Sequence, residues 1–156
     1  MDISLVLAVY NNLDYTKDCY DRIREIYPNA PMVISSGGST DGTLSWLESL
    51  NDDFLSYMHD DTEKLVLIHN DMVIGENFLE NLSDLIDEKT LLSYTTIEPP
   101  IFKGHKRAGK VILDLGSSFH DFKYDLFNQY VERVKQKKTL VNGASFFMSG
   151  YKTMFE

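Results

Sequence analysis

The sequence opens with a short apolar run, and apolar positions at helical spacing follow it. Residues 3–9 read Ile-Ser-Leu-Val-Leu-Ala-Val, a nearly continuous apolar run that is typical of a strand buried on both faces of a parallel sheet. After it, Cys19, Ile23 and Ile26 recur at intervals of four and three residues. This spacing predicts an amphipathic helix that ends before Pro28, because proline cannot continue a helix.

The alternation of strand and helix patterns then continues along the chain. Each apolar run is followed by a polar or small-residue loop and by apolar residues at helical spacing. Such alternation predicts an α/β fold in which a mostly parallel sheet is flanked by helices. The further expected segments are strands at 32–35, 55–58, 64–69 and 91–97 and helices at 44–50 and 74–86.

The last third of the chain is less regular. A strand is expected at 111–115 and another at 140–149. Between them, apolar residues at every fourth position predict a helix over 122–134. The chain shows no repeat or linker, so we expect a single domain over 1–156.

Composition narrows the class of protein further. Hydrophobic residues make up 43% and charged residues 25% of the chain, as in ordinary globular domains. The formal net charge of −9 disfavours a nucleic-acid partner, since phosphate backbones are bound by cations. The single Cys19 allows no internal disulfide, and no apolar run approaches the ~20 residues of a membrane span. We therefore expect a cytoplasmic protein without a transmembrane segment or an N-terminal secretory signal.

Three polar loops follow predicted strands. They are residues 10–12, 36–43 and 69–71. Because ligands of parallel sheets bind beyond the carboxyl ends of the strands, we expect the loops to form one site. The first loop offers an aromatic ring and an amide, and the second offers small residues for close approach. The third offers a carboxylate for a hard divalent cation.

These loops carry a resemblance to a known family. Leu5–Asn12 followed by Gly38–Thr43 resembles the opening of family 2 glycosyltransferases, which have the GT-A fold. Leu67–Ile74 followed by Asn77–Leu79 is similar to the family's short metal motif and the helix behind it. The pieces occur in the family's order and together cover roughly residues 3–86.

The resemblance implies a role for each matching residue. Ala8, Tyr10 and Asn11 would line the nucleotide base pocket, and Asn70 would lie near the ribose. Asp71 would bind Mn²⁺ or Mg²⁺ bridging the diphosphate of a nucleoside-diphosphate sugar. Such an ion neutralises the departing diphosphate.

The sequence also departs from the family pattern. Ser36 and Gly37 stand where the family usually has acidic residues that contact the base or ribose, and we retain both as nucleotide-contacting candidates. Only 25 residues separate Thr43 from His69, fewer than is usual. The resemblance therefore implies a nucleotide- and metal-binding half at 1–97 and an incomplete acceptor-side half at 98–156.

No carboxylate of this chain stands in the context of the family's catalytic base. Family members usually continue into an acidic motif after the acceptor-side strand, which Asn142-Gly143 resembles, and this chain stops at Glu156. Replacement carboxylates are available, none in a matching context: Glu98, Asp114, Asp121 and Asp125.

Structural roles compete with functional ones at several positions. Asp41 is a natural helix cap, and a cap of the helix that follows is the main structural alternative to metal binding at Asp71. Tyr10 could simply pack at the sheet edge, and a lone His69 is usually structural rather than a metal ligand.

Three other features are open to a plain structural reading. The basic loop from Lys103 to Lys110 is either solvated or a clamp for the diphosphate. Trp46 and the pair Phe146-Phe147 are expected in the core.

Three functions remain at this point. The first is a metal-dependent glycosyltransferase that moves a sugar to an acceptor hydroxyl, as in surface glycan synthesis. The second is a truncated or non-catalytic GT-A domain that binds a nucleotide or a partner protein. The third, a dinucleotide-dependent oxidoreductase, is disfavoured because Tyr10-Asn11-Asn12 stands where a glycine-rich turn is needed.

Overall fold

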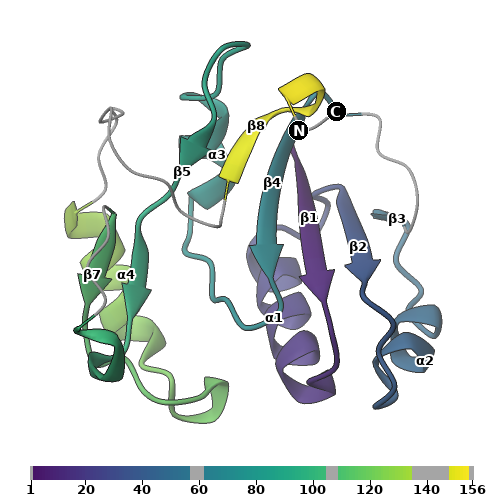
Figure 1. The fold of residues 1–156 in the computed structure, drawn as a ribbon, viewed down its shortest axis with the longest axis horizontal. Coiled ribbons are helices and arrows are strands. Elements are labelled where there is room, and N and C mark those ends of the chain that lie inside the picture. The colour runs from purple at the N-terminus through teal and green to yellow at the C-terminus, as the bar shows by residue number, and fades with distance from the viewer. Residues whose placement is uncertain (1, 57–61, 105–108, 135–147, 155–156) are drawn as a thin grey trace.

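The described residues form one large sheet and one small sheet. A computed structural model of the chain describes residues 2–56, 62–104, 109–134 and 148–154. The strands of the large sheet are β1 (Ser4–Val9), β2 (Met32–Ser36), β3 (Leu55–Ser56), β4 (Lys64–His69), β5 (Leu92–Ser93) and β8 (Met148–Tyr151). Their order across the sheet is β3-β2-β1-β4-β8-β5 (Figure 1). The small sheet pairs β6 (Thr96–Glu98) with β7 (Lys110–Ile112).

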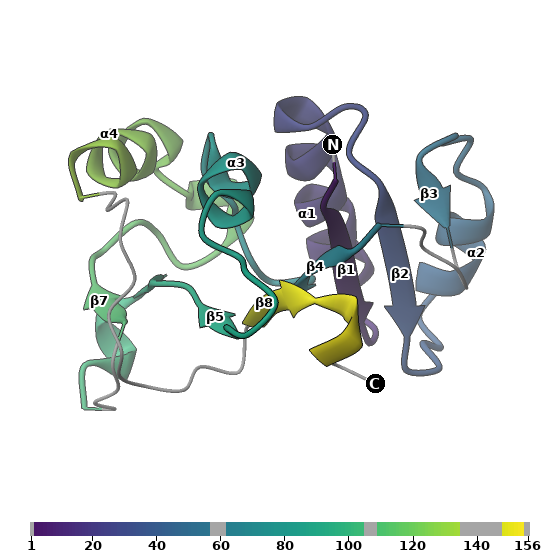
Figure 2. The same cartoon turned by 90° about the horizontal axis from the view of Figure 1, so that it is seen from above.

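Four α-helices and three 3₁₀ turns connect the described strands. The helices are α1 (Leu13–Ile26), α2 (Thr43–Glu48), α3 (Phe78–Ser83) and α4 (Tyr124–Val134). The 3₁₀ turns are η1 (Pro100–Phe102), η2 (Phe119–Asp121) and η3 (Lys152–Met154). Figure 2 shows α1 and α3 on the same side of the large sheet. Among the described helices, none is long and apolar enough to cross a membrane.

The large sheet is mixed, so the expectation of a mostly parallel sheet is wrong. Strand β1 pairs in parallel with both β2 and β4, and β2 pairs in parallel with β3. Strand β8, however, runs antiparallel to both β4 and β5. Hydrophobic patterning reports which residues are buried and carries no information on strand direction, which depends on the edge at which the chain re-enters the sheet.

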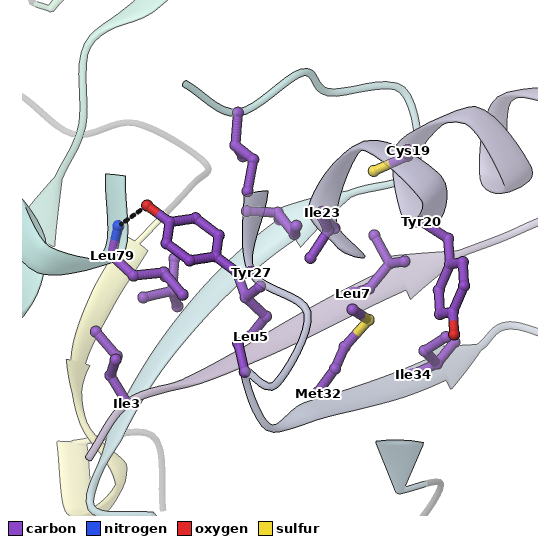
Figure 3. Packing of buried hydrophobic residues seen from close by; sticks show 14 of the residues in the cluster. Ile3, Leu5, Leu7, Cys19, Tyr20, Ile23, Tyr27, Met32, Ile34 and Leu79 are labelled. Carbon is purple, nitrogen blue, oxygen red and sulfur yellow. Dashed lines mark hydrogen bonds between the residues drawn. The ribbon is translucent and has the colours of Figure 1, made fainter. Parts of the chain in front are cut away.

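The core forms between β1 and α1, as the sequence predicts. Ile3, just before β1, and Leu5 and Leu7 of β1 occupy alternate positions and are fully buried. They belong to one apolar cluster with Cys19 and Ile23 of α1 (Figure 3). The predicted strand at 3–9 and the helix that ends before Pro28 are therefore confirmed, and their packing places the loop between them at the carboxyl edge of the sheet.

Two predicted elements differ from those observed. The helix expected over 74–86 spans only Phe78–Ser83, because Asn77 has a left-handed φ of 57° that stops the helix from starting earlier. Ile74 and Ile86 are buried without being helical, and their burial produced the apparent period. The strand expected over 91–97 divides into β5 and β6, which belong to different sheets.

The C-terminal segments agree with the expectations in part. The helix expected over 122–134 is α4, and the strand expected over 111–115 is the shorter β7. The strand expected over 140–149 falls mostly outside the described residues, which resume with β8.

Candidate functional site

The loops that follow β1, β2 and β4 leave the sheet side by side. In the register of the sheet, Ala8 lies opposite Ser35 on one side and opposite His69 on the other. Strand order reverses at this point, because the chain passes from β1 to β2 and β3 on one side and then crosses to β4 on the other. Such a reversal is where open α/β sheets bind their ligands.

The first loop presents an exposed tyrosine. The side chain of Tyr10 is 63% exposed, so Tyr10 does not belong to the core. Its ring lies against Gly37, where an added Cβ would come within 3.3 Å of Tyr10 Cδ2. Gly37 also donates a backbone hydrogen bond to Val9 at 3.0 Å. The absence of a side chain at position 37 therefore allows this close approach of the Tyr10 ring.

Asn11 joins the first two loops. Its backbone N–H donates to Ser39 Oγ at 2.9 Å, and its Oδ1 accepts from the Thr40 N–H at 2.8 Å. Ser36 Oγ lies 3.2 Å from Ser39 Oγ, so the predicted nucleotide contact Ser36 already has a partner inside its own loop. Asn11 also has a left-handed φ of 52°, a conformation that asparagine adopts more readily than most residues.

Asn70 anchors the third loop to the first. It is only 6% exposed, and its Nδ2 donates to the Asn11 carbonyl at 3.1 Å and to Thr16 Oγ1 at 2.8 Å. Both amide hydrogens are therefore used inside the protein. The buried Thr16 also donates to the Asn12 carbonyl at 3.1 Å.

Thr16 is a site-supporting residue that the sequence analysis missed. The available signal was a hydroxyl three residues before Cys19, on the buried face of the predicted helix. A buried hydroxyl needs hydrogen-bond partners, and those partners are the loop residues themselves.

Asp71 follows the anchored Asn70 and is exposed. Within the described residues, its carboxylate makes no hydrogen bond or ion pair. The interpretation of Asp71 as a helix cap is wrong, because α3 begins at Phe78 with Asn77 as its N-cap. Asp71 is thus a solvent-facing carboxylate at the sheet edge, and in the described part of the chain no three His, Cys, Asp or Glu side chains are grouped to hold a metal ion.

Asp41 is confirmed as a cap, and it serves two helices. Its Oδ2 accepts from the Leu13 N–H of α1 at 3.0 Å. Its Oδ1 accepts from Thr43 Oγ1 at 2.6 Å and from the Thr43 N–H of α2 at 3.2 Å. The hydrogen bond from the Thr43 hydroxyl is the main cause that lowers the pKa of Asp41 below its ordinary value. Asp41 therefore holds the first two loops together as an ionised carboxylate.

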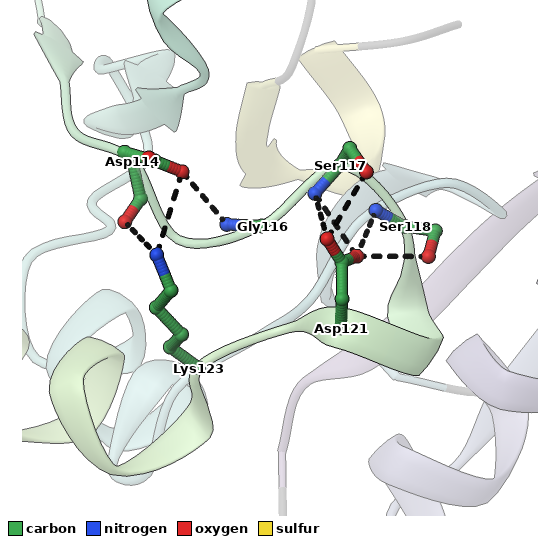
Figure 4. Close-up of polar contacts among 6 residues, drawn as sticks. All are labelled: Asp114, Gly116, Ser117, Ser118, Asp121 and Lys123. Carbon is green, nitrogen blue, oxygen red and sulfur yellow. Dashed lines mark hydrogen bonds and ion pairs between the residues drawn. The ribbon is translucent and has the colours of Figure 1, made fainter.

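Two of the candidate bases, Glu98 and Asp114, have cationic partners. Figure 4 shows the pair that Asp114 forms with Lys123. Glu98 pairs with Lys110 at 2.9 Å, and Asp114 pairs with Lys123 at 3.6 Å. Both carboxylates are therefore engaged in ion pairs within the fold.

Asp121 is engaged more strongly than the other candidate bases. It accepts hydrogen bonds from the N–H and hydroxyl groups of both Ser117 and Ser118 (Figure 4). These bonds, led by the one from the Ser117 N–H, hold the pKa of Asp121 well below its ordinary value. A general base works best with a pKa near the operating pH, so the structure disfavours Asp121 in that role.

Asp125 lies in a different environment. It lines an open groove between α1 and the segment from η2 to the start of α4, together with Asp18, Asp21 and Glu25. Phe119 of η2 contacts Tyr15 in the first turn of α1, with ring centroids 5.4 Å apart. Asp125 is thus the one carboxylate of the four candidates for which we find no structural partner in the described residues.

The remaining structural expectations have mixed outcomes. Trp46 packs against the core and meets Tyr20 edge to face at 5.5 Å, as expected. The basic loop is divided, because Lys110 is paired with Glu98 while residues 105–108 lie outside the described structure. Phe146-Phe147 and Asn142-Gly143 also lie outside it.

Comparison with known proteins adds no assignment. No protein-family model matches the chain, and none of the curated proteins matches it.

Proposed function

We propose that the chain is a GT-A-type domain of a metal-dependent glycosyltransferase, which moves a sugar from a nucleoside-diphosphate sugar to an acceptor hydroxyl. The observation that carries the proposal is the register of β1 with β2 and β4. It brings the three loops that resemble the family's motifs to adjacent positions at the reversal of strand order.

The nucleotide would lie on the first two loops. Tyr10 offers an exposed ring on which a base can stack, and Gly37 leaves room for that ring beside the second loop. Ala8, the residue before the last of β1, lies opposite Ser35 in the sheet and has a small side chain. Asn11 would act chiefly by fixing the shape of the pocket, since its Oδ1 already accepts from Thr40.

Asp71 would hold Mn²⁺ or Mg²⁺ at the diphosphate. The residue fits this role because its carboxylate is exposed and its oxygen atoms are ligands of the kind that hard divalent cations prefer. When bound, the ion would supply charge neutralisation of the leaving diphosphate. The buried Asn70 would keep Asp71 at the edge of the sheet, because its own side chain is fixed to Asn11 and Thr16.

A nucleotide-binding domain without transfer activity is the second candidate function. It is favoured by the engagement of three candidate bases, Glu98, Asp114 and Asp121, in ion pairs or capping hydrogen bonds. The two functions share the donor site and differ only in the presence of a positioned base.

A thermal-shift experiment tests the shared donor site. We expect uridine, guanosine or thymidine diphosphate to raise the melting temperature by several degrees only when Mn²⁺ is present. A ligand at about 100 times its dissociation constant stabilises by about 2.7 kcal/mol, and each 1 kcal/mol shifts the melting temperature of a domain this size by about 2–4 °C. Asp71→Ala should abolish the shift without unfolding the domain.

Asp84→Ala is the matched control, because Asp84 is also an exposed aspartate but lies at the end of α3. It should respond to nucleotide and Mn²⁺ as the unchanged chain does. Equal stabilisation of the Asp71→Ala and Asp84→Ala variants would contradict the metal role of Asp71.

A further inference from the structure

The small sheet carries an exposed apolar tip. Ile101 is 82% exposed and Phe102 is 45% exposed, and both belong to the 3₁₀ turn η1 between β6 and β7. Exposed single apolar residues are common, but two large ones in sequence on one short turn are a candidate contact surface. We call Ile101, Phe102 and the exposed Lys103 the η1 tip.

The η1 tip is held in place by hydrogen bonds. The Phe102 N–H donates to the Pro99 carbonyl at 3.0 Å, and the Lys103 N–H donates to the Pro100 carbonyl at 3.1 Å. Lys110, paired with Glu98, also donates to the Phe102 carbonyl. The apolar side chains are thus presented to solvent by an ordered turn, and contact with a partner would require little ordering of the backbone.

The sequence segment that contains the η1 tip has the opposite charge to the whole chain. Residues 99–113 contain three lysines, one arginine and no Asp or Glu: Lys103, Lys106, Arg107 and Lys110. Of these, Lys110 is paired with Glu98, and positions 106 and 107 lie outside the described residues. The chain as a whole carries −9. An exposed lysine next to exposed apolar side chains, in a basic segment of the sequence, suits a surface that is anionic outside and apolar within, which is the surface of an anionic membrane.

The tip also lies where such contact leaves the fold undisturbed. Figure 1 shows the small sheet at the opposite side of the molecule from β3, with η1 toward the same end as the carboxyl ends of β1 and β4. Figure 2 agrees that the small sheet is peripheral. Docking through η1 would therefore leave the large sheet intact and turn its ligand-binding edge toward the lipid surface.

We propose that the η1 tip docks this protein on an anionic membrane surface, with Ile101 and Phe102 entering the headgroup region and Lys103 facing the anionic lipids. The inference is independent of nucleotide binding. If the proposed function also holds, the acceptor would be a molecule presented at that surface.

Vesicle co-sedimentation of the full chain, without nucleotide or metal, tests this inference. We expect the chain to bind vesicles of phosphatidylcholine that contain about 30% phosphatidylserine. Binding should weaken in high salt, and vesicles of phosphatidylcholine alone should bind little. Phe102→Ser and Ile101→Ser should together lower the partition coefficient at least about ten-fold, because they remove the apolar contact. Lys103→Glu should lower it about five-fold or more.

Matched controls come from the same chain. Phe54 is 45% exposed, like Phe102, and lies beside β3 on the other side of the molecule. Phe54→Ser should leave vesicle binding unchanged, as should Lys89→Glu at another exposed lysine. Circular dichroism of every variant tests whether each one is folded.

Three results would overturn the inference. The first is no binding to anionic vesicles, and the second is an equal loss of vesicle binding in Phe102→Ser and Phe54→Ser. The third is that ultracentrifugation shows a dimer which Phe102→Ser dissociates, while neither the dimer nor the monomer binds vesicles. Asp71→Ala should bind vesicles like the unchanged chain, so failure of the donor-site proposal and failure of membrane docking are distinguishable.

Discussion

At the scale of the residue, Tyr10 and Asn11 are neighbours, but the fold depends on the side chain of Asn11 more than on that of Tyr10. Tyr10 extends into solvent, whereas Asn11 has a left-handed backbone and hydrogen bonds to the second and third loops. Loss of the Tyr10 ring therefore removes a surface for a ligand, while loss of the Asn11 side chain also weakens the loop itself.

We expect Tyr10→Ala to change the free energy of unfolding by less than about 0.5 kcal/mol and to weaken nucleotide binding by about 1–3 kcal/mol, the range for loss of a stacking ring. Asn11→Ala should destabilise the fold by about 1–2 kcal/mol, because alanine disfavours the left-handed φ and the Thr40 N–H loses its partner. Urea denaturation and calorimetry measure the two effects.

Asn11→Gly separates the two causes, since glycine accepts the φ and lacks the side chain. It should retain part of the stability that alanine loses. A loss of 3–5 kcal/mol in Tyr10→Ala, a size typical of a buried aromatic residue, would instead show that Tyr10 is part of the core.

The second residue-scale prediction concerns Asp121 and pH. Its folded-state pKa is lowered, so the carboxylate stabilises the fold above the unfolded-state value of about 3.9, and that contribution is lost as the pH falls toward the folded value. We expect Asp121→Asn to lower the melting temperature at pH 7, with a smaller difference from the unchanged chain below about pH 4. Melting curves over this range measure it, and a difference independent of pH would contradict it.

At the scale of the element, the loops and helices are tied by a few polar side chains. Asp41 accepts hydrogen bonds from the first residues of both α1 and α2. Tyr27, just beyond α1, accepts from the Leu79 N–H of α3 at 3.1 Å and donates to Glu80 at 2.8 Å. The helices that support the site are therefore positioned by specific hydrogen bonds as well as by apolar packing.

We expect Tyr27→Phe to destabilise the fold by about 1–2 kcal/mol, because the buried Leu79 N–H would lose its acceptor. The control is Tyr130→Phe on α4, whose hydroxyl has no hydrogen-bond partner in the described structure and whose loss should cost little. Denaturant unfolding of the two variants measures the difference. Equal stability of both would show that the Tyr27 hydroxyl contributes nothing to the docking of α3.

At the scale of the whole molecule, the donor edge and the candidate bases are supported unequally. The three loops of the donor edge are joined by hydrogen bonds across β1, β2 and β4. The candidate bases instead lie in and around the small sheet, η2 and α4, where three of them have structural partners. The loops of the proposed donor site are therefore joined to one another by hydrogen bonds, whereas three of the four candidate bases are occupied by structural partners.

We accordingly expect this chain to bind a nucleoside diphosphate measurably while consuming sugar donor slowly. Absence of a positioned general base typically lowers the rate by 10²–10⁴-fold, roughly, and leaves the metal and diphosphate contacts in place. Calorimetry and product release on one preparation, with a panel of sugar acceptors, measure both quantities. Acceptor-dependent turnover that is abolished by Asp125→Asn would contradict the expectation and identify the base.

Much of the fold and part of the site could be predicted from the sequence. Local patterning was enough for β1, α1 and the loops at their ends, because burial repeats every two residues in a strand and every three or four in a helix. Asp41 was identified as a cap on the same local grounds.

Long-range contacts decided the rest. The antiparallel direction of β8 depends on where the chain re-enters the sheet, and the short α3 depends on the left-handed Asn77, neither of which periodicity reports. Asn70 and Thr16 are 54 residues apart in sequence and hydrogen-bond beneath the site. The sequence by itself therefore determined which segments are buried and which polar residues follow the strands. Only the tertiary structure decided which of those residues hold the loops together and which, like Tyr10 and Asp71, remain open to a ligand, because hydrogen bonds between distant segments are formed only when the chain has folded.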